Sequence, residues 1–193
     1  MNAVAERGDP RGAMTRLRNI LLVAGLALAW LAGAQAGQER DAATHFFDAS
    51  FGDLKDELRQ ARAEGKHGLF LMFSAEDCSP CIRMKKTVMN QVKVQEHYRR
   101  HFRVLHIDFN GDVEMADVSG RAMRSKEYAQ KVARVNRTPT FLILGLDGAE
   151  LLRHHGPTRD AEEFLWLADF VVNGDSRSKP YDAYRRERLA SGR

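Results

Sequence analysis

The stretch "GLFLMFSAEDCSPCIRMKK", residues 68 to 86, contains the strongest structural signal of the chain. Its first part is continuously apolar up to Ser74, a pattern typical of a strand buried on both faces. Cys78 and Cys81 follow, and Pro80 stands where the first turn of a helix tolerates a proline. The stretch therefore predicts a buried strand that leads into a helix, with the first cysteine at the junction.

The segments around this stretch alternate between helical and strand patterns. Apolar spacing and turn signals predict a helix over 51–61, a strand over 102–109, a helix over 125–135, a strand over 136–145, a hairpin turn at 146–148 with its return strand, and a last helix after Thr158. This order indicates an α/β fold. We expect strands separated by helices to pair in parallel, and the closing hairpin to add an antiparallel strand.

The chain divides by composition into four parts. Residues 1–36 form a candidate signal peptide, 37–49 a polar leader, 50–173 one globular domain, and 174–193 a basic tail without apolar periodicity. We expect the tail to be extended, flexible and solvated. Within the domain, residues 110–124 are polar and punctuated by glycine, which indicates an insertion.

The N-terminal segment has the features of an export signal. Arg16 and Arg18 precede an apolar run from Ile20 to Ala34, and Ala34-Gln35-Ala36 supplies a cleavage site of small residues. The run is shorter than the roughly 18 to 20 residues that span a bilayer, so a retained membrane anchor is the weaker alternative. The sequence predicts an exported protein without a membrane span after cleavage, and it leaves Met1 and Met14 open as start sites.

The charge balance and the oxidising compartment each limit the functions that the sequence allows. The formal charge is +4, and basic and acidic residues are nearly balanced beyond the signal segment, which argues against nucleic acid as a partner. Outside the cytoplasm thiols are oxidised, and a disulfide between Cys78 and Cys81 would close too short a loop to stabilise the fold by much. The pair is therefore better explained by chemistry than by structure.

The spacing of cysteine and histidine leaves two other interpretations open. Cys78 and Cys81 together with His97 and His101 match the ligand spacing of a Cys2His2 zinc site. Lysines occupy positions where such a site needs an aromatic residue, and a polar helix face explains both histidines more simply. The third interpretation is a redox-inactive binding module with vestigial cysteines.

The chain resembles the thioredoxin superfamily. The resemblance rests on the strand that runs into Cys78-Ser79-Pro80-Cys81 and on Thr138-Pro139 before a hairpin and a final helix, and it covers roughly residues 45 to 173. It implies the thioredoxin fold, with a central mixed sheet of about four to five strands flanked by helices. Together with the export signal, it points to the periplasmic thioredoxin-like group, which includes SoxW-type proteins and relatives of the Dsb proteins.

The resemblance also implies roles for individual residues. Cys78 would attack, Cys81 would resolve, and Thr138 and a cis Pro139 would bind the substrate. The chain departs from the family pattern at Met72, where thioredoxins carry a buried acid, and at Asp77, where they carry tryptophan. Ser79 stands where they have glycine, beside the shared Pro80.

The function implied is that of an exported thiol–disulfide oxidoreductase, with reduction of protein disulfides preferred over oxidation. A negative charge at Asp77 should raise the pKa of Cys78 and so disfavour a strongly oxidising disulfide. The expected partners are proteins with thiols or disulfides and a membrane or soluble redox partner. No cofactor and no metal is expected, and we expect a monomer.

Overall fold

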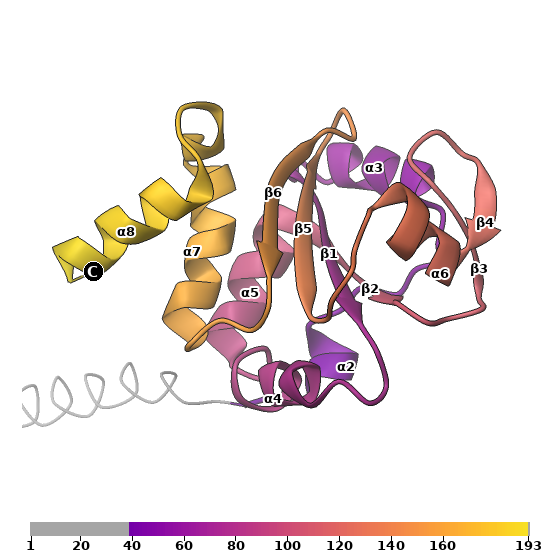
Figure 1. Cartoon of the computed structure of the whole chain (residues 1–193). Coiled ribbons are helices and arrows are strands. Elements are labelled where there is room, and N and C mark those ends of the chain that lie inside the picture. Colours follow the sequence, from indigo (N-terminus) through magenta and orange to yellow (C-terminus); the bar gives the residue numbers. More distant parts are fainter. Residues whose placement is uncertain (1–38, 193) are drawn as a thin grey trace, which may run out of the picture. The chain divides into compact units, whose positions relative to one another are not determined.

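The computed structural model describes residues 39–192, so the predicted signal peptide, residues 1–36, lies outside the described residues. The elements, labelled in Figure 1, are α2 (Ala42–His45), α3 (Leu54–Ala63), β1 (Gly68–Ser74), α4 (Ser79–Thr87), α5 (Val92–His101), β2 (Phe102–Asp108), β3 (Glu114–Ala116), β4 (Ala122–Arg124), α6 (Ser125–Glu127), the π-helix η1 (Tyr128–Val132), β5 (Thr140–Gly145), β6 (Glu150–His155), α7 (Ala161–Val172), the 3-10 helix η2 (Asp175–Arg177) and α8 (Tyr181–Ser191).

The central sheet confirms the predicted fold class. It has four strands in the order β2-β1-β5-β6, with β1 and β2 parallel and β5 and β6 antiparallel. One expectation is wrong, because β5 runs antiparallel to β1 although helical turns separate it from β2. The connection from β2 to β5 leaves the sheet beside Ser74 and returns beside Phe73, both at the C-terminal end of β1. Because the connection starts and finishes at the same end of the sheet, β5 must run antiparallel to β1 and β2.

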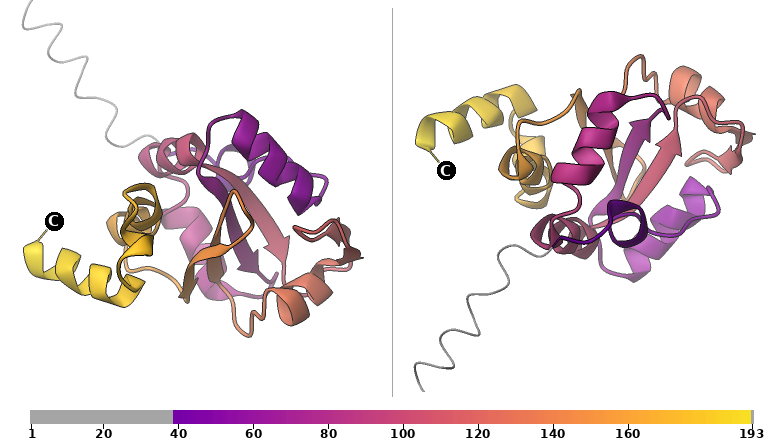
Figure 2. Two further views of the ribbon diagram at one scale, coloured as in Figure 1. Left: turned by 90° about the horizontal axis from the view of Figure 1, so that it is seen from above. Right: turned by 90° about the horizontal axis from the view of Figure 1, so that it is seen from below.

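Helices cover both faces of this sheet (Figure 1, Figure 2). Because side chains of a strand alternate between faces, even-numbered residues of β1 and β2 and odd-numbered residues of β5 point to one side and the others to the opposite side. The first side packs against α4, α5 and α7, and the second against α3 and η1. β1 is buried along its whole length, as its apolar run predicts.

Aromatic rings fill the first side, which we call the aromatic face; it comprises Phe46, Phe70, Tyr98, Phe141 and Phe164. Tyr98 stacks on Phe164 with ring centroids 4.6 Å apart, and its hydroxyl donates a 2.6 Å hydrogen bond to the Phe164 carbonyl oxygen. Full burial raises the pKa of Tyr98 well above its usual value, so this hydroxyl keeps its proton. The hydrogen bond ties α5 to α7. On the second side, the aliphatic face, leucine is the most frequent residue, and Phe73 and Tyr128 form its one stacked pair of rings among the described residues.

The leader is not a separate polar segment. Phe46 is fully buried against Phe70 and Tyr98, although it lies within residues 37–49. Asp48 extends the outer edge of β2, since its N–H donates to the Val104 carbonyl at 2.7 Å and its carboxylate accepts from the Val104 N–H at 2.8 Å. The domain therefore begins earlier than the predicted residue 50.

The tail is also ordered, so the prediction of an extended segment over 174–193 is wrong. Residues 181 to 191 form α8, and Tyr184 is buried against Phe170, with ring centroids 5.3 Å apart. Arg188 lies over the Trp166 ring at 5.2 Å from its centroid. A buried tyrosine and a stacked arginine anchor this helix to α7, although its many charged residues conceal any apolar stripe.

The predicted polar insertion contains structure of its own. Met115 pairs with Met123 across the short hairpin of β3 and β4, and α6 and η1 follow in place of the single helix predicted over 125–135.

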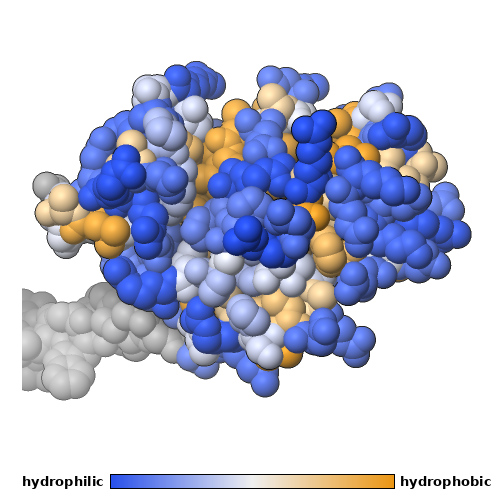
Figure 3. Space-filling view, viewed as in Figure 1, coloured by the Kyte–Doolittle hydropathy of each residue, from blue (hydrophilic) through white to orange (hydrophobic). Residues whose placement is uncertain are grey.

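Within residues 39–192, no helix is both long enough and apolar enough to span a membrane. Hydrophilic residues dominate the side of the molecule in Figure 3.

Candidate active site

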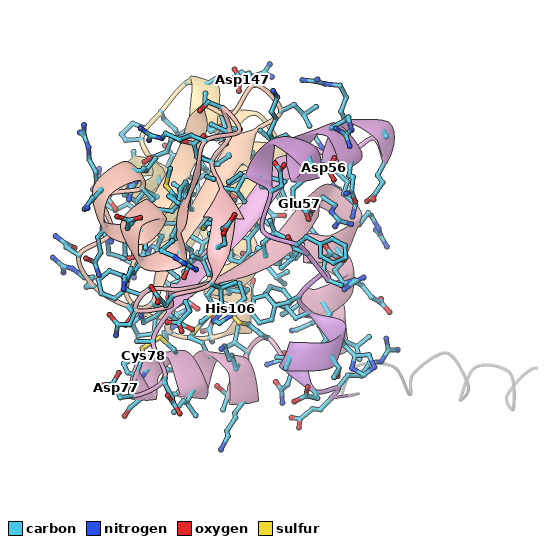
Figure 4. All side chains as sticks on the ribbon, turned by 90° about the vertical axis from the view of Figure 1, so that its right-hand side faces the viewer. Asp56, Glu57, Asp77, Cys78, His106 and Asp147 are labelled. Carbon is cyan, nitrogen blue, oxygen red and sulfur yellow. A yellow bond between two sulfur atoms is a disulfide. The ribbon has the colours of Figure 1, made fainter. Side chains whose placement is uncertain are left out.

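The two cysteines lie where β1 passes into α4. β1 ends at Ser74, the turn closes with a 3.3 Å hydrogen bond from the Cys78 N–H to the Ala75 carbonyl, and Cys78 becomes the N-cap of α4. Ser79 and Pro80 form the exposed first turn. Figure 4 shows Cys78 and Asp77 together at the start of the helix. The strand, junction and helix are those that the sequence predicts.

Cys78 and Cys81 form a disulfide, with Cα atoms 5.2 Å apart. Their surroundings differ, since Cys78 retains 8% of its surface exposed and Cys81 only 1%. The Cys81 N–H points at the Cys78 sulfur at 3.2 Å. A thiolate at Cys78 would accept this hydrogen bond and would benefit from the positive end of the helix dipole. The position can therefore stabilise the anion that thiol–disulfide exchange requires.

Charged side chains near the pair do not gather around the Cys78 sulfur. Glu76 and Asp77 are exposed on the approach to the helix. Arg83 donates to the Thr158 carbonyl at 3.2 Å, and Lys85 turns toward Ser74. Two of the basic residues of α4, Arg83 and Lys85, thus contact other groups rather than the Cys78 sulfur, and Lys86 is exposed.

Thr138 and Pro139 lie at the same end of the sheet as the cysteines, the C-terminal end of β1. Thr140 pairs with Phe73 of β1, so the two preceding residues lie beside the turn that leads to Cys78. The peptide bond between them is cis, Pro139 is buried and Thr138 is partly exposed. The Pro139 carbonyl accepts a 2.8 Å hydrogen bond from the Gly156 N–H. Part of Thr138 is therefore exposed to solvent at the end of the sheet that bears the disulfide.

A polar cluster on the aromatic face was missed by the sequence analysis. Ser74 Oγ lies 2.5 Å from His106 Nε2, and Lys85 Nζ lies 3.4 Å from the same nitrogen. His106 is an exposed residue of the edge strand β2, yet partial burial of its ring, and then the charge of Lys85, lower its pKa to about 4. Burial also lowers the pKa of Lys85, which Asp108 partly opposes. Strand register, which places Ser74 opposite Asp108, was the signal that could have revealed it.

The histidines of the zinc interpretation do not join the cysteines. His97 and His101 project from α5, and His97 Nε2 lies 2.9 Å from the Asp169 carboxylate of α7. In the part of the chain that the structure describes, no three His, Cys, Asp or Glu side chains are arranged to hold a metal ion. Both cysteines are engaged with each other.

Comparison with known proteins identifies the fold and the family. A family model described as thioredoxin-like domain matches residues 54–171. A thioredoxin-fold protein from Helicobacter pylori is 20% identical with a TM-score of 0.56, over 76% of this chain and 89% of that one. A thioredoxin from Thermus thermophilus is 23% identical with a TM-score of 0.50, over 66% and 91%. The DsbD C-terminal domain from Neisseria meningitidis is 17% identical with a TM-score of 0.46, over 60% and 92%.

No curated protein matches the sequence. The structural neighbours confirm the thioredoxin fold, and the match to the family model extends from α3 to α7, around the cysteine pair. This family and the disulfide at the start of α4 together support thiol–disulfide oxidoreductase activity. The chain belongs to the thioredoxin-like domain family.

Proposed function

We propose that the protein is an exported reductase of protein disulfides. Reduced Cys78 attacks one sulfur of a substrate disulfide as a thiolate, forms a mixed disulfide and releases the other substrate sulfur as a thiolate, which takes up a proton. Cys81 then loses its proton, attacks Cys78 and releases the second substrate thiol. Two electrons move to the substrate, and Cys78 and Cys81 become the disulfide present in the structure.

One observation carries this proposal: a disulfide whose first sulfur is at the N-terminus of α4. Cys78 is the more exposed of the two residues, which supports its role as the attacking cysteine. Cys81, nearly without solvent contact, suits the internal resolving step, because only Cys78 has to reach it. Electrons arrive and leave by the same exchange, so the reaction needs no bound cofactor or metal.

The reducing direction is supported by the charges beside the site. The acidic residues Glu76 and Asp77 precede Cys78, and no basic side chain of α4 pairs with its sulfur. The acidic charges offset part of the stabilisation that the Cys81 N–H and the helix dipole give a Cys78 thiolate. A less stabilised thiolate raises the free energy of the reduced form, which favours giving electrons to a substrate. Ser79 and Pro80 fix the first turn between the two sulfurs.

Substrate contact is proposed for Thr138 and Pro139. The exposed part of Thr138 is available to pair through its backbone with an extended substrate segment, in the manner of strand addition. Export is supported by the sequence of residues 14–36, and the source of electrons would be a membrane or soluble thiol protein in the periplasm. We propose that the mature protein acts as a monomer.

The test is a redox titration of residues 37–193 against glutathione and dithiothreitol buffers, combined with a zinc assay. A reduction potential near the thioredoxin value of about −270 mV supports a reductase, and one near about −120 mV indicates an oxidant. Cys78→Ser should abolish reduction of insulin disulfides. Cys81→Ser should trap a mixed disulfide with the substrate. One bound zinc per chain with no intramolecular disulfide would overturn the proposal.

A further inference from the structure

The end of β6 brings one histidine to the segment proposed to bind substrate. His155 lies opposite Thr140 in the pairing of β5 and β6. The next residue, Gly156, donates the hydrogen bond to the Pro139 carbonyl. His155 is therefore connected through its own strand to the Thr138-Pro139 pair, and its side chain is exposed.

The hydrogen bonds of Thr140 fix the tautomer of this histidine. The Thr140 hydroxyl has a single proton, and it lies 2.8 Å from the Arg137 carbonyl oxygen, which can only accept. The hydroxyl also lies 2.9 Å from His155 Nδ1. With that proton donated to the Arg137 carbonyl, the hydrogen-bond network assigns an N–H to Nδ1 and makes Thr140 its acceptor. In the neutral ring, Nε2 then carries no proton and is a hydrogen-bond acceptor.

The same contacts hold the proposed binding segment in place. Arg137 and Thr140 flank Thr138-Pro139 on either side, and the chain of hydrogen bonds from His155 through Thr140 to Arg137 joins both ends. Nε2 has no hydrogen-bond partner within residues 39–192, so it is available to a ligand. His154, the preceding residue, instead points to the aromatic face and stacks on Phe141 with an interplanar angle of 5°.

The ring is neutral near pH 7. Burial lowers the pKa of His155 from its usual value of 6.5, and the positive charges of Arg153 and Arg137 lower it further. Glu150 is the one nearby group that opposes this shift. An acceptor that is uncharged at physiological pH suits a backbone N–H, which is a neutral donor.

We infer that His155 is a substrate-positioning residue, which anchors the 137–140 segment through Nδ1–H and accepts a hydrogen bond at Nε2 from the backbone of an extended substrate segment lying along Thr138. This role rests on the proposed function. It adds a side-chain contact to the backbone pairing and makes substrate affinity depend on the protonation of one ring. The ring touches no sulfur and takes no part in the exchange itself.

The first measurement is independent of activity. Long-range proton–nitrogen spectra of the full-length mature protein should show His155 with its proton on Nδ1 at pH 7. Thr140→Val, which removes the hydroxyl, should shift the ring toward the other tautomer. A proton on Nε2 in the unmodified protein would overturn the assignment.

The second measurement uses dye-labelled insulin as substrate and dithiothreitol as reductant. Loss of one hydrogen bond is worth about 1 kcal/mol, so His155→Leu should raise KM about fivefold. The kcat and the reduction potential of this variant should not change, whereas a general structural defect would alter both. His155→Gln, which keeps an acceptor, should stay within about twofold of the wild-type KM. The matched control is His67→Leu, because His67 precedes β1 at the opposite end of the sheet.

The pH profile separates positioning from packing. As the pH falls through the His155 pKa, below 6.5, Nε2 gains a proton, and wild-type kcat/KM should fall relative to that of His155→Gln. An active wild type with unchanged KM in His155→Leu would overturn this role alone. A wild type that does not reduce insulin, with the expected tautomer still present, would overturn the proposed function and the role that rests on it.

Discussion

The two faces of the central sheet are packed by different chemistry. On the aromatic face, Phe164 contacts the rings of Phe46, Phe70, Tyr98 and Phe141, with centroids 4.6 to 6.0 Å apart. The aliphatic face is packed mainly by leucine side chains from α3 and the sheet. Rings in edge-to-face contact prefer particular orientations, whereas leucine packing tolerates more rearrangement. The helix that bears the disulfide packs on the aromatic face, where orientation is most constrained.

Truncation of one large side chain on each face is the strongest way to test this difference. Phe164→Ala should lower the free energy of unfolding by about 4 kcal/mol, because it removes a fully buried ring and leaves a cavity. Leu58→Ala, on α3 with 8% exposure, should cost about 2 kcal/mol, because its site can partly collapse. Urea unfolding measures both values. Equal losses would show that the two faces are equally rigid.

A buried ion pair at the rim of the aliphatic face gives the next largest effect. Arg103 Nε donates to the Glu57 carboxylate at 2.8 Å, and Glu57 is only 3% exposed. Arg103→Met should cost about 3 kcal/mol, because it leaves a carboxylate buried without a partner. The double variant with Glu57→Met should recover most of that stability. A double variant as unstable as the single one would mean that the pair itself stabilises the fold.

The C-terminal helix extends the aromatic face and predicts a smaller loss. Tyr184→Ala removes the ring that packs on Phe170, and it should cost about 2 kcal/mol with a loss of helical signal from α8 in circular dichroism. Arg186→Ala, at an exposed position of the same helix, should change stability by less than about 0.5 kcal/mol. Equal effects of the two substitutions would contradict the docking of α8.

The smallest expected effect is a pH dependence that belongs to the aromatic face. In the unfolded chain His106 takes up a proton near pH 6.5, but in the folded protein only near pH 4. The unfolded state therefore binds more protons between these values, so stability should fall as the pH decreases from about 6.5 toward 4. His106→Gln should reduce this slope in urea unfolding at several pH values. An unchanged slope would show that the titration of His106 does not contribute to the pH dependence of stability.

The sequence predicted the parts of the molecule whose signals are local. The apolar run of β1, the cysteines at the start of α4 and the hairpin at Gly148 each follow from residues close together in the chain. The fold class followed from the order of such signals. The direction of β5 did not, because it depends on the path of a long connection rather than on any residue within the strand.

Contacts between distant residues account for what was missed. Phe46 and Tyr184 gain their burial from partners far away in sequence, so their own surroundings look polar. The cluster of Ser74, Lys85 and His106 joins two strands and a helix, and only the register of the sheet brings it together. The cysteine pair was visible in the sequence, but its polar neighbours became visible only in three dimensions.

The segments before and after the family domain have a consequence for solubility. Asp48 pairs with the outer edge of β2, and at the opposite edge of the sheet Tyr181 packs against His154 of β6, with ring centroids 5.8 Å apart. Open strand edges recruit other strands and lead to aggregation. A chain trimmed to the predicted domain, residues 50–173, would lose both covers at once. It would then leave Val104 at the outer edge of β2 without its partner and the His154 ring of β6 uncovered, even with its disulfide site intact.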